Sequence, residues 1–154
     1  METILSIAAI ILSVISGVFT FYTFIWTTCR DRKQATLDAY NQLQEQALDY
    51  LNYYRPAEIV EIAKSPRSEE YKKVSAYIAR IEHFCVGVNQ KTYDSETVYA
   101  LAHGYLDGAI KERIEPIIDR KNSFGSTDYY ENIHQVYTWM AKRKNRCDRV
   151  IIRK

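Results

Sequence analysis

The first part of the chain is an unbroken apolar stretch. From Ile4 to Thr27 no residue is charged and none is proline, and Glu2 is the one charged residue among the first 29. At about 1.5 Å per residue, these 24 residues predict a helix of roughly 36 Å, enough to cross a hydrocarbon core of about 30 Å. The acidic start and the aromatic end, with Phe24 and Trp26, are typical of a retained membrane anchor rather than a cleaved signal peptide.

Positive charge follows the apolar stretch and does not precede it. Arg30, Arg32 and Lys33 come directly after it, so the positive-inside rule predicts an outside N-terminus and a cytosolic C-terminal part. The cysteines are odd in number and widely spaced, which favours reduced thiols of a cytosolic domain over disulfides; they are Cys29, Cys85 and Cys147.

Small and hydroxyl-bearing residues recur within the apolar stretch at alternating spacings of three and four. This heptad-like seam consists of Ser6, Ala9, Ser13, Ser16, Thr20, Thr23 and Thr27. Such residues let membrane helices approach and hydrogen-bond to one another, so the seam predicts self-association into a left-handed bundle, and it would line a water path if the bundle opened. The alternative is that the hydroxyls bond back to carbonyls of their own helix.

The rest of the chain predicts helices, and the expected fold class is all-α. Residues 1–29 form the transmembrane helix, residues 30–55 a membrane-proximal amphipathic helix, and residues 56–154 a cytosolic bundle of about four to five helices. No glycine or proline separates the first two segments, so we expect one nearly continuous rod that ends at Pro56.

The helix boundaries of the cytosolic part follow from caps and periodicity. Pro56 begins a short helix, and Ser68 caps the next one, which is apolar at helical spacing from Tyr71 to Val88. A longer helix is expected from Asp94 or Ser95 to about residue 117, bent or ended at Pro116. Thr127 or Asp128 would cap the last helix, and the final VIIRK fits a short strand or a helical turn equally well.

Motifs for catalysis and metal binding are missing from the sequence. His83, His103 and His134 share no ligand spacing, and neither a phosphate-binding glycine loop nor a nucleophile elbow is present. We therefore expect no enzyme, no catalytic residue, no metal and no cofactor. A net charge of +2 gives no general affinity for duplex nucleic acid.

Charge and tyrosine are unevenly distributed. Residues 142–154 contain seven basic residues and one acidic residue, although the whole chain has a net charge of only +2. Such a cluster favours an anion, either phosphates or the inner leaflet, and nearby tyrosines offer faces on which bases stack; a solvated helix face and ordinary packing are the alternatives. The candidate ligand-binding residues are Lys142, Arg143, Lys144, Arg146, Tyr129, Tyr130, Tyr137, His103 and Tyr105.

The segments ATLDAYNQL, IEHFCVGV and YDSE, together with the anchor, resemble small bacterial proteins of unassigned function with one N-terminal membrane helix and a helical cytosolic domain. In layout, size and tyrosine-rich, basic character, the chain also resembles the membrane effectors of type III CRISPR systems that are gated by cyclic tetra-adenylate. This resemblance implies a protein of the bacterial inner membrane. Its cytosolic domain would form a tetramer, bind the ring nucleotide and perturb the membrane helices.

Two functions are therefore expected. The first is an antiviral-defence effector that binds a cyclic oligonucleotide and permeabilises the membrane through its oligomeric helices, with ligand, lipid and further copies of the chain as its partners. The second is an anchored scaffold or adaptor that recruits a partner protein without ligand gating.

Overall fold

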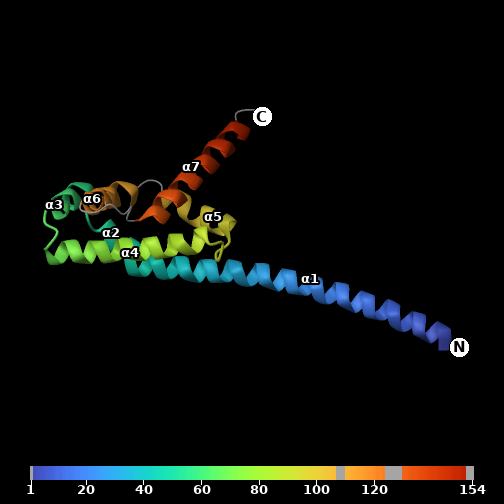
Figure 1. Ribbon diagram of the computed structural model, residues 1–154. Helices are drawn as coiled ribbons and strands as arrows, with labels where there is room; N and C mark the ends of the chain where they lie inside the picture. Colours follow the sequence, from blue (N-terminus) through green and yellow to red (C-terminus); the bar gives the residue numbers. More distant parts are fainter. Residues whose placement is uncertain (1, 107–109, 124–129, 152–154) are drawn as a thin grey trace.

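The computed structural model describes the backbone of residues 2–106, 110–123 and 130–151, and the side chains of residues 7, 9–106, 110–123 and 130–144. Every regular element in this part is helical, which confirms the all-α prediction (Figure 1). In chain order the elements are α1 (Glu2–Leu43), a π-helical turn (Gln44–Leu48), α2 (Asp49–Asn52), α3 (Pro56–Ala63), α4 (Glu69–Asn89), α5 (Ser95–Tyr105), α6 (Lys111–Asn122) and α7 (Glu131–Ile151).

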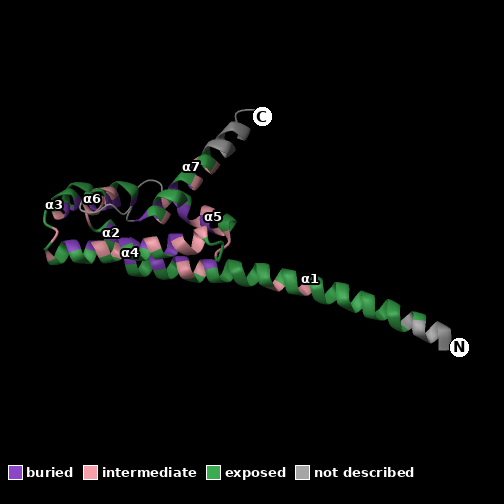
Figure 2. Ribbon diagram, viewed as in Figure 1, coloured by how far each residue is buried: buried purple, intermediate pink, exposed green. Residues whose placement is uncertain are grey.

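Helix α1, the π-helical turn and α2 join without a break into the rod that the sequence predicts. The N-terminal half of the rod projects from the domain with its apolar side chains exposed (Figure 2). Ile11, Phe19 and Trp26 are each more than half exposed, so the described part of the chain leaves this surface uncovered. Among the described residues, this helix alone is long and apolar enough to span a membrane.

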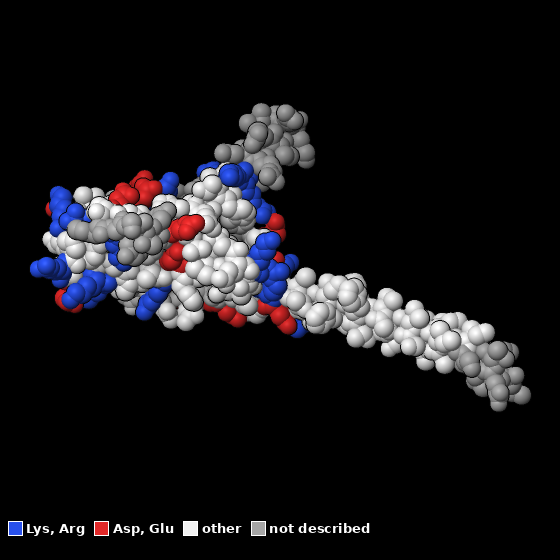
Figure 3. All heavy atoms as spheres, viewed as in Figure 1, with Lys and Arg blue, Asp and Glu red and all other residues white. Residues whose placement is uncertain are grey.

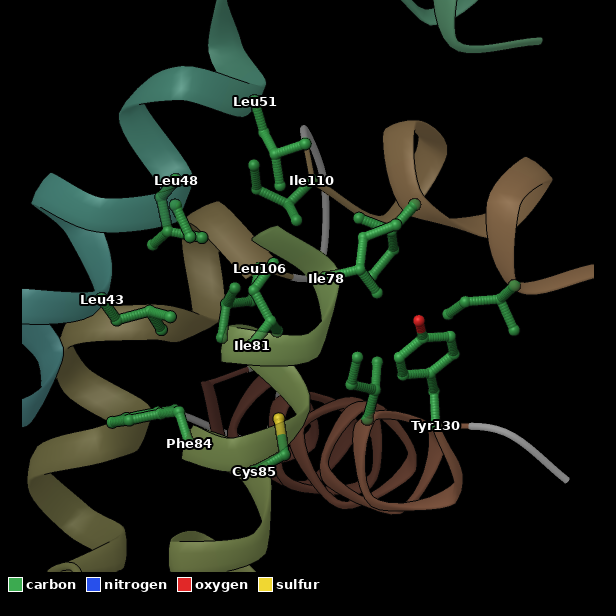
Figure 4. Packing of buried hydrophobic residues seen from close by; sticks show 14 of the residues in the cluster. Leu43, Leu48, Leu51, Ile78, Ile81, Phe84, Cys85, Leu106, Ile110 and Tyr130 are labelled. Carbon is green, nitrogen blue, oxygen red and sulfur yellow. The ribbon is translucent and has the colours of Figure 1, made fainter. Parts of the chain in front are cut away.

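The C-terminal half of the rod packs against α4, which lies alongside it in the opposite direction. One core joins both helices to α3, α5, α6 and α7. Leu48 and Leu51 of the rod meet Ile78 and Ile81 of α4, while α7 closes the other side of α4 (Figure 4). Because α1 supplies part of this core, the domain cannot turn freely relative to the apolar helix.

Helix starts follow the predicted caps. The Ser68 hydroxyl accepts the N–H of Tyr71 at 3.1 Å, and Asp94 caps α5 by accepting the N–H of Thr97 at 2.9 Å. Pro56 is the first residue of α3, where its missing N–H costs no hydrogen bond. The proposed caps Thr127 and Asp128 lie outside the described residues.

The helix expected from Asp94 or Ser95 to about residue 117 is described in two parts, because residues 107–109 lie outside the described range, and Leu106 and Ile110 on either side of them are π-helical. Helix α5 ends at Tyr105, and α6 begins at Lys111 and contains Pro116. Helix α5 packs on α1 and α6 packs on α3, and Leu106 and Ile110 between these helices are both fully buried. At the end of the chain α7 continues to Ile151, so the described part of VIIRK is helical and its last three residues lie outside the described range.

Candidate functional site

A membrane-proximal junction ties the α4–α5 turn to the start of the polar part of α1. The Arg32 guanidinium donates to the carbonyls of Lys91 and Tyr93 at 2.9 and 3.0 Å. Four residues along, the buried Thr36 hydroxyl accepts the N–H of Asp94 at 2.8 Å and donates to the Arg32 carbonyl at 2.7 Å. The domain is thus attached to the rod directly below the apolar segment.

The α4–α5 turn is shaped by two unusual residues. Lys91 has a φ of 59° and occupies the left-handed position of a Schellman motif. In this motif the Thr92 N–H donates to the carbonyl of Gly87 at 3.0 Å. The Tyr93 ring folds back onto Gly87 and stacks on Phe84 with centroids 5.2 Å apart. A Cβ atom on residue 87 would lie 2.9 Å from Tyr93 Cδ2 and closer still to Cε2, so only glycine fits there.

Charges around the junction act on Asp94. Hydrogen bonds from the Thr97 backbone and hydroxyl, together with the nearby Lys33 and Arg32, hold the pKa of the Asp94 carboxyl below its usual value, although partial burial opposes them. The ionised carboxylate suits the N-terminus of α5, because that end of the helix carries partial positive charge.

A groove runs between α1 and α4 next to this junction, with a volume of about 420 Å³. It is hollow because Ala39 of α1 and Ala79 of α4 are small, and Leu43 and Phe84 form its apolar floor. Polar side chains line the rim; these are Gln42, Gln46, Arg80 and His83, and the Tyr93 ring lies among them. A groove of this size with a few convergent polar groups is typical of a small-ligand site.

The π-helical turn lies at the far end of the groove. The Asp49 N–H bonds to the Gln44 carbonyl, five residues back, which widens the helix and alters the direction of neighbouring carbonyls. Arg80 of α4 donates to one of them, that of Gln46, at 2.6 Å. The rod is thus irregular where a groove side chain holds it, and π-helical turns of this kind are frequent at functional sites.

A second polar cluster joins α5 to α7. Arg143 forms an ion pair with Glu96, and its guanidinium lies over the rings of Tyr99 at 4.5 Å and Trp139 at 5.9 Å. The His103 ring stacks on the Tyr99 ring, with centroids 4.6 Å apart. The hydrogen bond from Arg143 is the main reason why the pKa of Glu96 lies below its usual value.

The structure brings some of the predicted ligand residues together and separates others. Arg143 and His103 share the α5–α7 cluster, and Lys142 and Lys144 are exposed beside it. Glu96, Tyr99 and Trp139 of the cluster are not among the predicted residues, although the four-residue spacings of Tyr99 and His103 and of Trp139 and Arg143 place each pair on one helix face. Tyr129 and the Arg146 side chain lie outside the described residues.

The remaining predicted tyrosines do not offer stacking faces. Tyr130 and Tyr137 are buried in the core, and packing against α4 explains why, because α7 lies across that helix. The Tyr130 hydroxyl accepts a hydrogen bond from Lys121, and burial, with Glu82 adding to it, raises the pKa of Tyr130 to about 12. Tyr105 is half-buried against the core near Tyr40 and Asp49 of the rod, and burial raises its pKa.

Among the seam residues of α1 whose side chains are described, Ala9, Ser13, Ser16 and Thr20 are exposed, and Thr23 and Thr27 are partly buried. In the single chain the threonine hydroxyls bond back to their own helix, for example Thr20 to the Ser16 carbonyl at 2.8 Å and Thr27 to the Thr23 carbonyl at 2.8 Å. Each hydroxyl oxygen still has lone pairs to accept a bond from a neighbouring helix. The Ser6 side chain lies outside the described range.

The seam and the domain occupy different faces of the rod. Continuing the seven-residue repeat beyond Thr27 leads to Gln34 and Asn41, and both are exposed. The core contacts of the rod instead come from Tyr40 and Leu43. A second copy approaching along the seam would therefore not meet the first copy's own domain on that face.

Cysteine and metal chemistry receive no support from the described part. Cys29 is an exposed free thiol and Cys85 a buried one, and burial, with Glu82 adding to it, raises the pKa of Cys85. The Cys147 side chain lies outside the described range. No group of three His, Cys, Asp or Glu side chains within the described residues comes together as metal ligands would.

These features define a helical domain built onto one long N-terminal helix that is able, by length and composition, to span a membrane. Residues 8–143 match a family described as a domain of unknown function, DUF4760. Because this match covers most of the chain, the protein belongs to that family. The matched region includes most of the apolar helix, the junction and the groove. No curated protein and no solved structure matches the chain.

Proposed function

We propose that this protein is a single-pass membrane effector whose domain controls the packing of its membrane helices. The apolar part of α1 spans a bacterial inner membrane, and the positive charges of Arg30, Arg32 and Lys33 keep the domain on the cytosolic side. The exposed apolar surface of α1 supports this anchorage. The family match supports it too, because it starts at residue 8 and so includes the apolar segment in the shared region.

One observation carries the proposal. The helix that lines the groove is the same helix that continues, without a break, into the apolar segment. A ligand held between α1 and α4 touches the rod directly, so a preference of the ligand for one arrangement of these two helices shifts the position of the membrane part as well. The hydrogen bonds of Arg32 and Thr36 attach the domain to α1, so that the domain and the apolar part of α1 move together.

The ligand we propose is a cyclic oligonucleotide, and cyclic tetra-adenylate is the ring that the resemblance to CRISPR effectors implies. Arg80 supplies a cation for a phosphate, while Gln42, Gln46 and His83 supply hydrogen-bonding groups for a base edge. A groove of about 420 Å³ accommodates one nucleotide unit rather than a whole ring. Four copies would therefore share one ring, which agrees with a tetramer assembled along the seam.

Dye release from vesicles tests the proposal. The full chain is reconstituted with a trapped dye, and cyclic tetra-adenylate is expected to cause release. Arg80→Gln should abolish the response because it removes the cation of the groove, whereas Arg67→Gln, an exposed arginine in the α3–α4 loop, should leave it intact. Absence of both binding and release with the unaltered chain would refute this function.

An exposed aromatic patch favours a second candidate, an anchored scaffold. Tyr53 is 83% exposed, and Tyr50 is 49% exposed while stacking on Tyr77 with centroids 5.3 Å apart. Tyrosines are enriched at the centres of protein interfaces. A scaffold would retain a cellular partner without any nucleotide, and Tyr53→Ala, but not Arg80→Gln, would then abolish the retention.

A further inference from the structure

Positive side chains gather at the end of the domain from which the apolar helix emerges (Figure 3). Arg30 and Lys33 are exposed on α1 just beyond the apolar segment, and Lys91 is exposed at the tip of the α4–α5 turn. Lys142 and Lys144 add two exposed charges on α7. These five residues form a basic collar, a name used below for this set alone.

The α5–α7 cluster connects the two parts of the collar. Glu96 forms an ion pair with Arg143 of α7, and Lys33 of α1 is close enough to favour the ionised form of the same carboxylate. Asp94, two residues before Glu96, donates its backbone N–H to Thr36 of α1. The base of the projecting part of α7 therefore lies next to the point where α1 becomes apolar.

Helix α7 extends well past the core. Among the described side chains, which end at Lys144, the last core residue is Met140, and the backbone of the helix continues to Ile151, roughly 16 Å further at 1.5 Å per residue. The projecting part points away from the α3–α6 end of the domain, and it diverges from α1 as the two helices leave the domain (Figure 1).

The collar also lies at the expected level of lipid headgroups. The Arg30 guanidinium lies 5.4 Å from the centre of the Trp26 ring, and tryptophan beside arginine at the end of an apolar helix is typical of the membrane–water interface. Anionic headgroups attract lysine and arginine clusters that directly follow a membrane helix.

We propose that the basic collar, with the projecting end of α7, docks onto anionic lipid headgroups of the cytosolic leaflet. The inference rests on the anchorage proposed above but not on a nucleotide ligand. Docking adds a second attachment to α1 and fixes the tilt of the domain over the membrane. The occupant is lipid, because the end of the apolar segment places the collar at this surface and its charge is complementary to that of the leaflet.

Amide hydrogen exchange of the full chain in nanodiscs tests the docking. In phosphatidylcholine alone, the amides of residues 142–151 should exchange quickly, and in a mixture with phosphatidylglycerol they should exchange much more slowly. Each lysine near an anionic surface strengthens binding by about fivefold, so Lys142→Gln with Lys144→Gln should lower this protection by about 25-fold. High salt should have the same effect.

Lys64→Gln with Lys73→Gln is the matched control, because these exposed lysines lie at the α3–α4 end of the domain and should leave the protection unchanged. Co-elution of protein and lipid tests the anchorage separately. Equal exchange in the two lipids, or an equal loss with the control pair, would overturn the docking. Protection by cyclic tetra-adenylate in neutral nanodiscs, without any lipid effect, would also overturn it and would assign the lysines to the nucleotide instead.

Discussion

The Glu82 carboxylate of α4 accepts the backbone N–H of Ile133, the third residue of α7, at 3.0 Å. The same carboxylate accepts the backbone N–H and the side-chain amide of Asn132 at 3.2 and 2.7 Å. A side chain of α4 thus caps the N-terminus of α7, about fifty residues later in the sequence. The negative charge of Glu82 lies at the end of α7 where the helix dipole is positive. This contact fixes where α7 starts and therefore where its projecting end points.

Loss of this cap should destabilise the domain. Glu82→Ala leaves two N–H groups of α7 without their acceptor, so we expect the free energy of unfolding to fall by about 2 kcal/mol. Thermal unfolding of the detergent-solubilised full chain, followed by circular dichroism, measures the change. Glu61→Ala, which removes an exposed ion pair with Lys64, should change the value by less than about 0.5 kcal/mol; equal losses would contradict the capping role.

Two glycines offer a matched pair of substitutions. Gly87→Ala would place its methyl group in the Tyr93 ring and should cost about 2 kcal/mol through displacement of that ring. Gly104→Ala meets nothing within 4 Å in α5 and should stabilise the helix by about 1 kcal/mol. The same unfolding measurement distinguishes them. In a Tyr93→Ala background, Gly87→Ala should cease to be harmful, and a persistent cost would show that the ring is not the cause.

Lys91 should be replaceable with a gain in stability. Its φ of 59° strains a residue that has a Cβ atom, and glycine adopts this conformation without strain, so Lys91→Gly should stabilise the fold by about 1 kcal/mol. Denaturant unfolding of both proteins in detergent measures the difference. Thr92→Gly in the same turn lacks this benefit, because Thr92 has no positive φ, and should be neutral or destabilising. Equal gains for both would argue against strain at Lys91.

Asp94 should make stability depend on pH in the acidic range. Its folded pKa lies below the ordinary value, so its contribution is fully present above about pH 4 and is lost as the pH falls through the folded pKa. Asp94→Ala should cost about 1 kcal/mol at neutral pH, and the difference from the unaltered chain should shrink below about pH 4. Unfolding curves from neutral to acidic pH measure this, and a difference that grows on acidification would refute the assignment.

Local patterns in the sequence predict much of the fold, because periodicity and caps depend on residues close together in the chain. The apolar positions of α4, from Tyr71 to Cys85, are buried as their helical spacing predicts. Ser68 and Asp94 cap the helices that follow them, and the rod continues to α2. The π-helical conformation of Leu106 and Ile110 is not evident from the sequence, since it depends on which neighbouring helix each segment packs against rather than on its own residues.

The candidate sites depend on contacts between residues far apart in the chain, which single-sequence patterns do not contain. Arg80 bonds to Gln46 and Arg32 to the α4–α5 turn only because α4 lies alongside α1. Charge and residue type drew attention to Arg143 and to Tyr130. Burial then distinguishes them, because Arg143 lies at the surface with Glu96 and Tyr130 lies in the core.

The π-helical turn sets the azimuth at which the membrane helix faces its neighbours. An α-helix turns by about 100° and rises about 1.5 Å for each residue. Removing one residue within Gln44–Leu48, so that the turn becomes α-helical, would rotate the seam by about 100° around the helix axis while the domain keeps its own contacts. The direction of the serine and threonine side chains in the bilayer is thus encoded some twenty residues away, in the irregular turn that Arg80 holds.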